Sequence, residues 1–461
     1  MRLNKSTTAG LTAAVLLSVL PPAASAARNA AVGRNAWQVL AEGEETVKDT
    51  LRLSLTDVFS RIETENRTME MLRSASVAAK EGVTAAKNAR FPDVNAELNA
   101  SYIGDAFLTD RDFSNITRAE TPHFGNGFTF EAQQVVYAGG AVNASVSLAE
   151  SQSEMADTQI DKTREGLRLM AAGQCMDLFR IGNNIEVYKE NISLTEKLID
   201  EIQARREQGL ALANDVTRYE LRLEMLKLEL VRLENTKATL NFRLCNALGL
   251  PEGTVIIPSL ETGEEIRPES HEDWQTAARQ SSPDLRMADI NADMAVTRRQ
   301  LAKSEILPKI AVVAYENFNG PITFEIPPIN KNLNVWYVGL GIRYNFSALY
   351  KSNHKIRQAD AAARQMSQAT EVAQENLRNE VQQAYTDYRQ AYQELETRKK
   401  SLQLAEENYA RVHDRYIEQL VLVTDMLDAF NMKLDAQLGV SDSEAEIVYR
   451  LCRLKHAAGT L

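Results

Sequence analysis

The sequence RREQGLALANDV occupies residues 205–216, and RYIEQLVLVTDM occupies residues 415–426 with a similar pattern of polar and apolar positions. Asp215 and Asp425 hold the same place in the two copies and lie 210 positions apart (425 − 215). Each copy lies between a very long polar stretch with helical periodicity and a shorter, leucine-rich one. The chain is therefore predicted to build a helical hairpin twice, and an internal repeat of this size decides the fold class.

The first residues of the chain, 1–26, have the three parts of a secretory signal peptide. Arg2 and Lys5 supply the positive part, residues 11–20 the apolar part, and the small residues 24–26 a cleavage site. An uncleaved membrane anchor is the alternative. The apolar part is too short to span a bilayer, and no later run approaches the roughly 20 apolar residues that a transmembrane helix needs. The sequence therefore predicts export.

Composition excludes two classes of protein. Removal of the signal peptide leaves 50 of the 52 basic residues against 63 acidic ones, a net charge of −13 (50 − 63), whereas a nucleic-acid partner requires a basic face. Cys175, Cys245 and Cys452 are too few for a disulfide framework in a chain of 461 residues. Glycine and proline are sparse and the helical runs are long, which favours an elongated architecture over several globular domains.

The first repeat is predicted to span residues 51–250, after an N-terminal arm at residues 27–50. It opens with a helix from near Leu51 to about Arg90, which ends there because Pro92 cannot continue a helix. After two strands, a helix of nearly 70 residues, a turn and a shorter helix complete the repeat. At 1.5 Å per residue the long helix extends over roughly 100 Å.

Two strands are predicted near residues 91–136, separated by a polar loop at residues 104–123. Strict alternation of apolar and polar residues is the period of a strand with one apolar face. The apolar positions of the first strand are Val94, Ala96, Leu98, Ala100 and Tyr102. The second strand alternates in the same way, with its apolar face at Phe128, Phe130 and Ala132.

The second repeat is predicted to span residues 270–461, after a linker at residues 251–269. A helix from about Glu272 ends at Pro308, which lies 216 positions after Pro92 (308 − 92). This offset is close to that of the hairpin turns. The second half of the chain is therefore expected to follow the plan of the first.

Two further strands are predicted near residues 308–346, followed by a long helix over about residues 350–419, a turn and a final helix. The third strand alternates less regularly than the first. The fourth is the clearest of all, with its apolar face at Trp336, Val338, Leu340, Ile342, Tyr344 and Phe346. Glycine and polar residues occupy the opposite face of this strand.

The predicted strands have about the 9–11 residues that cross a bilayer when tilted, with aromatic residues near their ends. From the strands alone, a soluble sheet with one wet face is the alternative. Export favours the membrane. Open sheet edges are not tolerated in lipid, and the smallest known barrels have about eight strands, so several chains must contribute strands to one barrel. The sequence therefore predicts an oligomer.

Heptad spacing on the helices predicts a coiled coil, because apolar residues recur at steps of three and four. On the first hairpin they are Val216, Tyr219, Leu223, Leu226, Leu230, Leu233, Leu240, Leu244 and Ala247. On the second long helix they are Val381, Tyr385, Tyr388, Tyr392, Leu395, Leu402 and Tyr409. A plain helical bundle has the same periodicity and stays open on the pattern alone. The strand pairs joined to the long helices favour a helical wall that continues a barrel.

Three motifs give the chain a resemblance to the TolC-like outer-membrane efflux family. Residues 53–58 (LSLTDV) resemble the family's opening helix, and residues 282–286 (SPDLR) resemble its Asn-Pro-acidic-Leu-Arg element, with serine in place of asparagine. Residues 135–140 (VVYAGG) resemble its strand-to-helix junction, a motif that the second copy at residues 346–350 has lost. The resemblance covers essentially the whole mature chain.

This resemblance implies an α+β fold in which a homotrimer closes four strands per chain into a 12-stranded outer-membrane β-barrel. A long periplasmic α-helical coiled-coil tunnel continues the barrel, so the chain contacts outer-membrane lipid at one end and the periplasm at the other. The implied function is the exit duct of a tripartite efflux or type I secretion system. Cargo would reach it from an inner-membrane pump, of RND or ABC type, through a periplasmic adaptor.

An enzyme would need converging catalytic groups, and the sequence shows none. It has no phosphate loop, no Gly-x-Ser-x-Gly element and no paired histidines at metal spacing, so neither a cofactor nor a metal is expected. The histidines are scattered, at His123, His271, His354, His413 and His456. The alternatives to a duct are a non-conducting oligomeric coiled-coil tether or adhesin of the outer membrane, and a secreted enzyme.

The family resemblance also implies site residues at the hairpin turns, Gly209 and Gln419, which would lie at the periplasmic entrance and receive the adaptor. Two acidic positions that narrow the entrance in the family match Asp425 and Asp428. Their i, i+3 spacing puts both carboxylates on one helix face. Several copies around an axis would make a negative constriction that favours cations. Without the family, the pair would be two solvated surface charges.

A latch between neighbouring hairpins is the second implied site. Tyr416 matches the family's tyrosine, and Asn214 with Asp215 match its acceptor pair on the first hairpin. The family's partner arginine falls on Val421, so that half of the latch is missing or replaced. Asp215 has an alternative role as a helix cap.

Overall fold

The computed structural model describes residues 50–259, 270–325 and 328–461. The predicted signal peptide, the N-terminal arm up to residue 49 and the end of the predicted linker lie outside these ranges. Within them, no helix combines the length and the apolar character that crossing a membrane requires.

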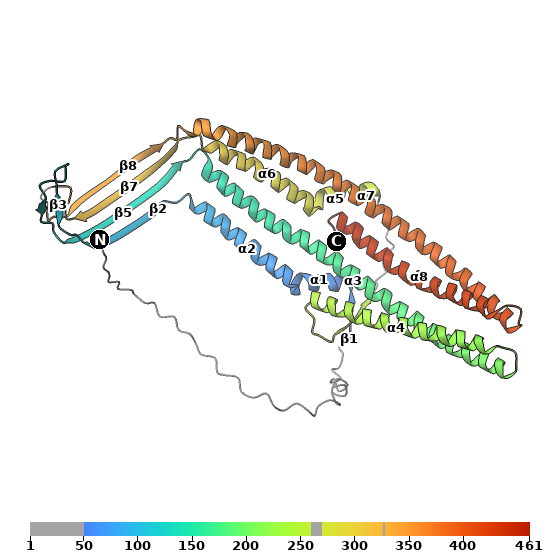
Figure 1. The fold of residues 1–461 in the computed structure, drawn as a ribbon. Helices are drawn as coiled ribbons and strands as arrows, with labels where there is room; N and C mark the ends of the chain where they lie inside the picture. The colour runs from blue at the N-terminus through green and yellow to red at the C-terminus, as the bar shows by residue number, and fades with distance from the viewer. Residues whose placement is uncertain (1–49, 260–269, 326–327) are drawn as a thin grey trace, which may run out of the picture. The chain divides into compact units, whose positions relative to one another are not determined.

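As predicted, each half of the described chain contains strands followed by a long helical hairpin (Figure 1). Its first half contains β1 (Thr50–Ser54), α1 (Leu55–Glu65), α2 (Arg67–Asn88), β2 (Asp93–Tyr102), β3 (Ala106–Leu108), β4 (Thr117–Ala119), β5 (Phe124–Tyr137), α3 (Ala141–Glu207), α4 (Ala213–Ala247) and β6 (Val255–Ser259). Its second half contains α5 (His271–Ser281), α6 (Pro283–Ser304), β7 (Lys309–Gly320), β8 (Leu333–Arg343), α7 (Ala348–Ile417) and α8 (Val423–Ala457). The predicted fold class is confirmed.

The ends of the hairpin helices show how closely the two halves repeat. α3, α4, α7 and α8 each end before a residue with a φ between 62° and 74°, and these residues are Gly209, Gly249, Gln419 and Gly459. After α3 the Leu210 N–H donates to the Arg205 carbonyl at 2.9 Å, and after α7 the Leu420 N–H donates to the Arg415 carbonyl at 2.9 Å. This pattern is the Schellman ending of a helix. The predicted turns are therefore built in the same way, 210 positions apart.

β2, β5, β7 and β8 form one antiparallel sheet in that order. Its register aligns the predicted apolar faces, because Leu98 lies opposite Phe128 and Phe128 lies opposite Phe318. Trp336 of β8 lies on the same face, opposite Glu316 of β7. The irregular alternation of the third strand thus comes from Glu316 on this face, together with Val313 and Tyr315 on the opposite one. β2 and β8 are the edges of the sheet, and most of their residues are exposed.

Residues 50–54 form the strand β1, although the sequence predicts a helix from near Leu51. Leu51 and Leu53 alternate with polar residues, and the strand pairs in parallel with β6, about 200 residues later. The helix begins only after Ser54, because the Ser54 hydroxyl accepts the Asp57 N–H at 3.2 Å and the Asp57 carboxylate accepts the Ser54 N–H at 3.0 Å. This capping box is a strong helix start. The predicted helix start is therefore wrong by four residues.

The helix predicted before each pair of strands is broken in two. Asn66 separates α1 from α2, and Ser282 separates α5 from α6, 216 positions later (282 − 66). The Asn66 side chain accepts the Thr68 N–H at 2.9 Å, and the Ser282 hydroxyl accepts the Leu285 N–H at 3.4 Å. Pro283 then occupies the first turn of α6. Short polar side chains that cap a new helix compete with the continuation of the old one.

The polar loop predicted between the first two strands contains a hairpin of its own, formed by β3 and β4. An ion pair between Arg118 and Asp105 joins the two sides of this hairpin. The Asp105 carboxylate also accepts the Thr121 N–H at 3.4 Å. Local pairing of this kind gives the loop a regular structure that its polar composition does not suggest.

The last strand is shorter than predicted. β8 ends at Arg343, so Tyr344 and Phe346 lie beyond the strand. The Asn345 side-chain carbonyl accepts both the N–H and the hydroxyl of Ser347, at 3.2 and 2.7 Å. A side chain that bonds the backbone two residues later forms a turn, which ends the strand before α7 begins.

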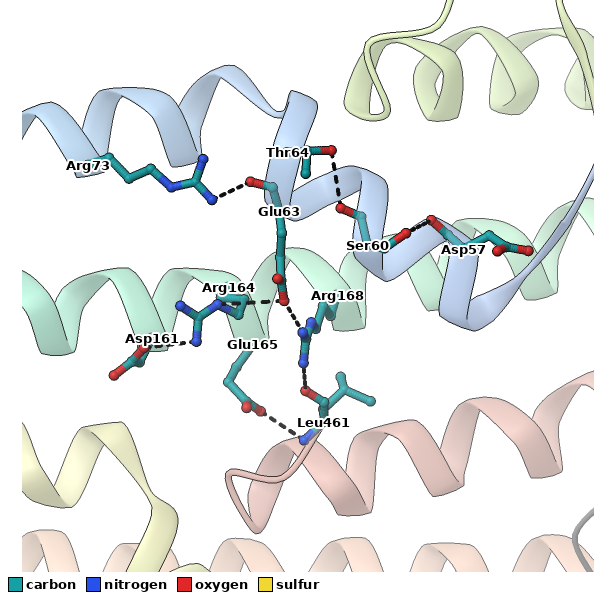
Figure 2. A network of polar contacts seen from close by, with 10 residues as sticks. All are labelled: Asp57, Ser60, Glu63, Thr64, Arg73, Asp161, Arg164, Glu165, Arg168 and Leu461. Carbon is teal, nitrogen blue, oxygen red and sulfur yellow. Dashed lines mark hydrogen bonds and ion pairs between the residues drawn. The ribbon is translucent and has the colours of Figure 1, made fainter.

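α3 packs on α2, α4, α6 and α8, and α8 packs also on α7. Near the middle of α3, Arg168 pairs with the Glu63 carboxylate of α1 and donates to the Leu461 carbonyl oxygen (Figure 2). The Leu461 N–H in turn donates to the Glu165 carboxylate at 3.2 Å. Burial raises the pKa of Glu165. This network ties the segment after α8 to the middle of α3, between the sheet and the hairpin turns.

Candidate entrance site at the hairpin turns

The two hairpin turns lie above one apolar cluster. Its buried members are Leu198, Ile199, Ile202, Val216, Tyr219, Val423 and Met426, which come from α3, α4 and α8. Tyr409, Val412 and Tyr416 of α7 pack against them. Because all four helices contribute, the two turns have a common packed base.

Asp215 and Asp425 are the third residues of α4 and α8 and make the same contact. The Asp215 carboxylate accepts the Leu212 N–H at 3.1 Å, and the Asp425 carboxylate accepts the Leu422 N–H at 3.0 Å. Each carboxylate thus bonds a free donor at a helix N-terminus, where the helix dipole also favours negative charge. The helix-capping role considered for Asp215 is present, and Asp425 shares it.

Asp428 lies one turn after Asp425 on α8, and both side chains are exposed on the same face of that helix. Asp428 makes no hydrogen bond or ion pair with the described residues. Asp425 carries no ion pair there either, since its hydrogen-bond partner among the described residues is the Leu422 N–H. The described part of the chain therefore presents two carboxylates without an ion partner beside the second turn. Across the described ranges, no cluster of histidine, cysteine and acidic residues has the arrangement of a metal site.

The Tyr416 side chain is half-buried against the apolar cluster of the turns. Burial raises the pKa of its hydroxyl, the nearby Asp215 carboxylate raises it further, and Arg205 lowers it. Within the described chain this hydroxyl makes no hydrogen bond to Asn214 or Asp215, and Asn214 is exposed. The structure thus brings Tyr416 and Asp215 into electrostatic range without a direct bond. The latch between neighbouring hairpins stays a prediction.

Arg205 is a residue of this site that the sequence analysis missed. It lies in the last turn of α3, and its guanidinium donates to the Tyr416 carbonyl at 3.2 Å and to the Ile417 carbonyl at 2.5 Å. It also lies over the Tyr416 ring, 5.6 Å from the centroid. The carbonyls at a helix C-terminus lack intrahelical donors, so a cation there satisfies them and complements the helix dipole. Arg205 therefore connects the first hairpin to the second.

A signal for Arg205 was present in the sequence, because Arg415 holds the same position in the second copy of the repeated stretch. An arginine retained in both copies, just before the turn, is a candidate for the same helix-end contact. Its partner carbonyls belong to a helix about 210 residues away, and only the fold shows that they are close.

Replacing Gln419 with glycine is expected to raise the free energy of unfolding by about 1 kcal/mol, because a non-glycine residue at φ 62° is strained. The matched change Gly209→Gln is expected to lower it by a similar amount. No atom lies within 4 Å of a Cβ built at Gly209, so its cost comes from the backbone conformation alone. The denaturant midpoint measures both effects. Equal midpoints for the two variants and the unmodified chain would contradict this account of the turns.

Comparison with known proteins shows which family this chain is similar to. Residues 274–460 match the model of the outer membrane efflux protein family. The chain is 22% identical over 422 residues to the outer membrane protein TolC of Vibrio cholerae, an alignment that covers 88% of this chain and 91% of that protein. Among solved structures, the outer-membrane channel OprN matches with a TM-score of 0.75 at 15% identity, covering 88% of this chain and 90% of OprN. VceC from Vibrio cholerae matches with a TM-score of 0.73 at 16% identity, covering 88% and 96%.

The family match includes the second hairpin with Tyr416, Gln419, Asp425 and Asp428, and the match to TolC extends over both repeats. The solved structures share the arrangement of a four-stranded sheet continued by long helical hairpins. Sequence and fold thus lead to the same group. Residues 274–460 match the outer membrane efflux protein family, and the chain as a whole is TolC-like.

Proposed function

We propose that this chain is the exit duct of a tripartite efflux or type I secretion system. Members of its family are outer membrane efflux channels rather than enzymes, and TolC-family channels form trimers that work with an adaptor and a pump. In this chain the sheet lies in the outer membrane, and the helical hairpins extend into the periplasm. A periplasmic adaptor docks at the hairpin turns, and an inner-membrane pump of RND or ABC type supplies the cargo.

The observation that carries this proposal is the sheet with two free edges. Among the described strands, β2 and β8 are each paired on one side only. Apolar residues with more than half of their surface exposed lie along both: Val94, Leu98 and Tyr102 on β2, and Trp336, Val338, Leu340 and Ile342 on β8. Lipid covers such an apolar face but leaves no partner for free backbone donors and acceptors. β8 of one copy therefore pairs with β2 of the next, and three copies give a closed barrel of 12 strands.

The proposed entrance lies at the other end of the helices. Around the trimer axis, Asp425 and Asp428 of each copy face the opening and make a negatively charged constriction that favours cations. Tyr416, Asn214 and Asp215 bond neighbouring hairpins in the closed state. Two features support this arrangement. Among the described residues, the Asp pair has no ion partner and the Tyr416 hydroxyl has no hydrogen-bond partner.

Single-channel recording of the purified mature protein in a planar bilayer tests the duct. The expected result is a small, cation-preferring current from a membrane-inserted trimer, with partial block by multivalent cations. A membrane-inserted oligomer that passes no current under any applied voltage, even with its adaptor present, would contradict the duct and favour a non-conducting tether.

A further inference from the structure

One face of α4 and one face of α7 are uncovered in a single chain. α4 packs on α3, α3 on α8, and α8 on α7, and α5 and α6 pack on the part of α7 nearer the sheet. Toward the turns, α4 and α7 are therefore the end helices of the two hairpins. Both carry exposed apolar residues, which are Leu221, Met225, Leu228 and Val231 on α4, and Tyr392 and Leu404 on α7. The internal repeat indicates what covers these faces.

The offset of 210 positions relates the packing of the two hairpins as well as their turns. Leu178 of α3 and Tyr388 of α7 are 210 positions apart, and both are buried. Leu244 of α4 and Leu454 of α8 have the same offset, and both are fully buried. A contact between α3 and α8 therefore has a counterpart between α7 and α4. Its residues are found by adding 210 to the position on α3 and subtracting 210 from the position on α8.

The contacts between α3 and α8 define a register. The Asn184 amide donates to the Asp442 carboxylate at 3.3 Å, and the Asn191 amide donates to the Gln437 side chain at 3.1 Å. These two contacts place α3 and α8 antiparallel, with position 184 beside 442 and position 191 beside 437. They lie within one chain and in the half of α3 that leads to the turn.

The counterparts of the first contact are oppositely charged. Asn184 corresponds to Glu394 on α7 (184 + 210), and Asp442 corresponds to Arg232 on α4 (442 − 210). Both Glu394 and Arg232 are exposed, and each bonds only to a residue of its own helix within the described chain. The contact between Asn184 and Asp442 inside the chain thus corresponds, on the uncovered faces of α7 and α4, to a glutamate and an arginine. Such residues form an ion pair when they meet.

The apolar counterparts agree. Leu194 of α3 and Leu438 of α8 pack against the same buried cluster. They correspond to Leu404 on α7 (194 + 210) and Leu228 on α4 (438 − 210), which are each 54% exposed in the single chain. The counterparts of two leucines that share one buried cluster are therefore both exposed in the described chain.

We propose that α7 of one copy packs on α4 of a second copy in the register in which α3 packs on α8 within the chain. Glu394 then pairs with Arg232 of the partner subunit, and Leu404 packs with Leu228 of the partner subunit. This contact joins unlike surfaces head to tail, which closes into a ring. The inference rests on the proposed trimer and deepens it, because it states which residues meet at the subunit boundary.

The same relation extends to the turns. Arg205 of α3 donates to the last carbonyls of α7, at Tyr416 and Ile417. Its counterpart Arg415 is exposed, and its side chain has no polar partner in the described chain. In the ring, Arg415 donates to the carbonyls at positions 206 and 207 of the partner subunit, at the end of α3. Arginine–carbonyl contacts then alternate within and between subunits around the entrance.

Cross-linking tests the register. The chain with Glu394→Cys and Arg232→Cys is treated with a short bismaleimide in detergent and resolved on a denaturing gel. Covalent dimers and trimers are expected from the double variant, and monomers from each single variant. Cys175, Cys245 and Cys452 are buried, so the folded chain without added cysteines stays monomeric on the gel.

Two matched control pairs show whether the cross-link reports the contact between subunits in the proposed register. Asn184→Cys with Asp442→Cys occupies the same positions inside the chain and is expected to link without forming dimers. Ser401→Cys with Arg232→Cys moves the cysteine on α7 by seven residues, about 10 Å, and is expected not to link.

The outcomes separate the register from the duct. If the mass in detergent is trimeric and the bilayer current is present, but only the shifted pair links, the register is overturned and the duct stands. If the mass in detergent is monomeric and no current flows, the proposed function itself fails.

A charge exchange provides a readout that does not depend on cross-linker reach. Glu394→Arg and Arg232→Glu are each expected to lower the temperature at which the trimer dissociates, and the double exchange is expected to restore it. The corresponding exchange at an exposed pair within one helix, Lys189→Glu with Glu186→Lys, is expected to leave that temperature unchanged. If the two single exchanges lower the dissociation temperature and their losses simply add in the double exchange, the proposed pair is overturned.

Discussion

Replacing Asp425 and Asp428 together by asparagine is expected to enlarge the single-channel conductance and to weaken block by multivalent cations by at least about tenfold, or about 1.4 kcal/mol. The reason is electrostatic, because each copy carries two carboxylates into the proposed constriction. Asparagine keeps an oxygen that accepts the Leu422 N–H, so the start of α8 stays capped while the charge is lost. Planar-bilayer recording with and without a trivalent cation measures both effects.

The repeat offers a matched control for this change. Asp215 makes the same contact with the backbone as Asp425, at 3.1 Å against 3.0 Å, but lies in the first hairpin. Asp215→Asn therefore removes one charge beside a turn and leaves both carboxylates of the proposed constriction in place. Because Asp215 belongs to the proposed latch, the channel is expected to open more often, but block of the open channel by the cation is expected to be unchanged. If Asp215→Asn and the double variant relieve block equally, the constriction does not depend on the Asp pair.

Replacing Arg205 by alanine is expected to loosen the second hairpin from the first. The guanidinium bonds two carbonyls at the end of α7, and hydrogen bonds to a charged group contribute about 1.5–3 kcal/mol when buried. Arg205 is only half-buried, so solvent screening reduces this to about 1 kcal/mol. Amide hydrogen exchange at residues 205–216 and 415–426 is expected to accelerate by roughly fivefold. The channel is expected to open more often in bilayer recordings.

Arg206→Ala is the control for Arg205→Ala, since Arg206 is exposed and its side chain makes no hydrogen bond or ion pair with the described residues. Arg205→Lys is expected to fall between the two, because an ammonium group lacks the fork that reaches both carbonyls. Exchange that accelerates equally in Arg205→Ala and Arg206→Ala would show that the effect is one of net charge, not of the contact with α7.

Local patterns in the sequence predicted the parts of the fold that depend on local structure. Gly209 and the repeat around it predicted the turns, because a helix that ends at a left-handed residue can be recognised within a few positions. Alternation in β2, β5 and β8 predicted the strands and the shared apolar face, since each residue reports its own side of the sheet. Both signals lie within one element.

The missed features depend on distant or competing contacts. β1 needs β6 as its partner, and no pattern near Leu53 indicates a strand so far along the chain. The break at Ser282 was within reach of the sequence, because a capping residue followed by proline in the first helical turn is a helix start. Asn66 is also a capping residue, but no proline follows it. The periodicity on both sides concealed them. Arg205 required the tertiary contact with α7, so its repeat counterpart Arg415 was the only local signal.

The equal lengths of α4 and α8, 35 residues each, restrict how such a chain can change over evolutionary time. One inserted residue rotates every later side chain by about 100° around the helix axis, so an insertion in one hairpin alone would misalign it with its neighbours. α7 is three residues longer than α3, and its start is offset by only 207 positions from the start of α3 (348 − 141). Three residues turn a helix by about 300°, close to a full turn, and they lie at the sheet end, outside the stretch where the offset is 210. The lengths of the two hairpins are thus constrained together toward the turns, whereas toward the sheet each long helix can differ in length from the other.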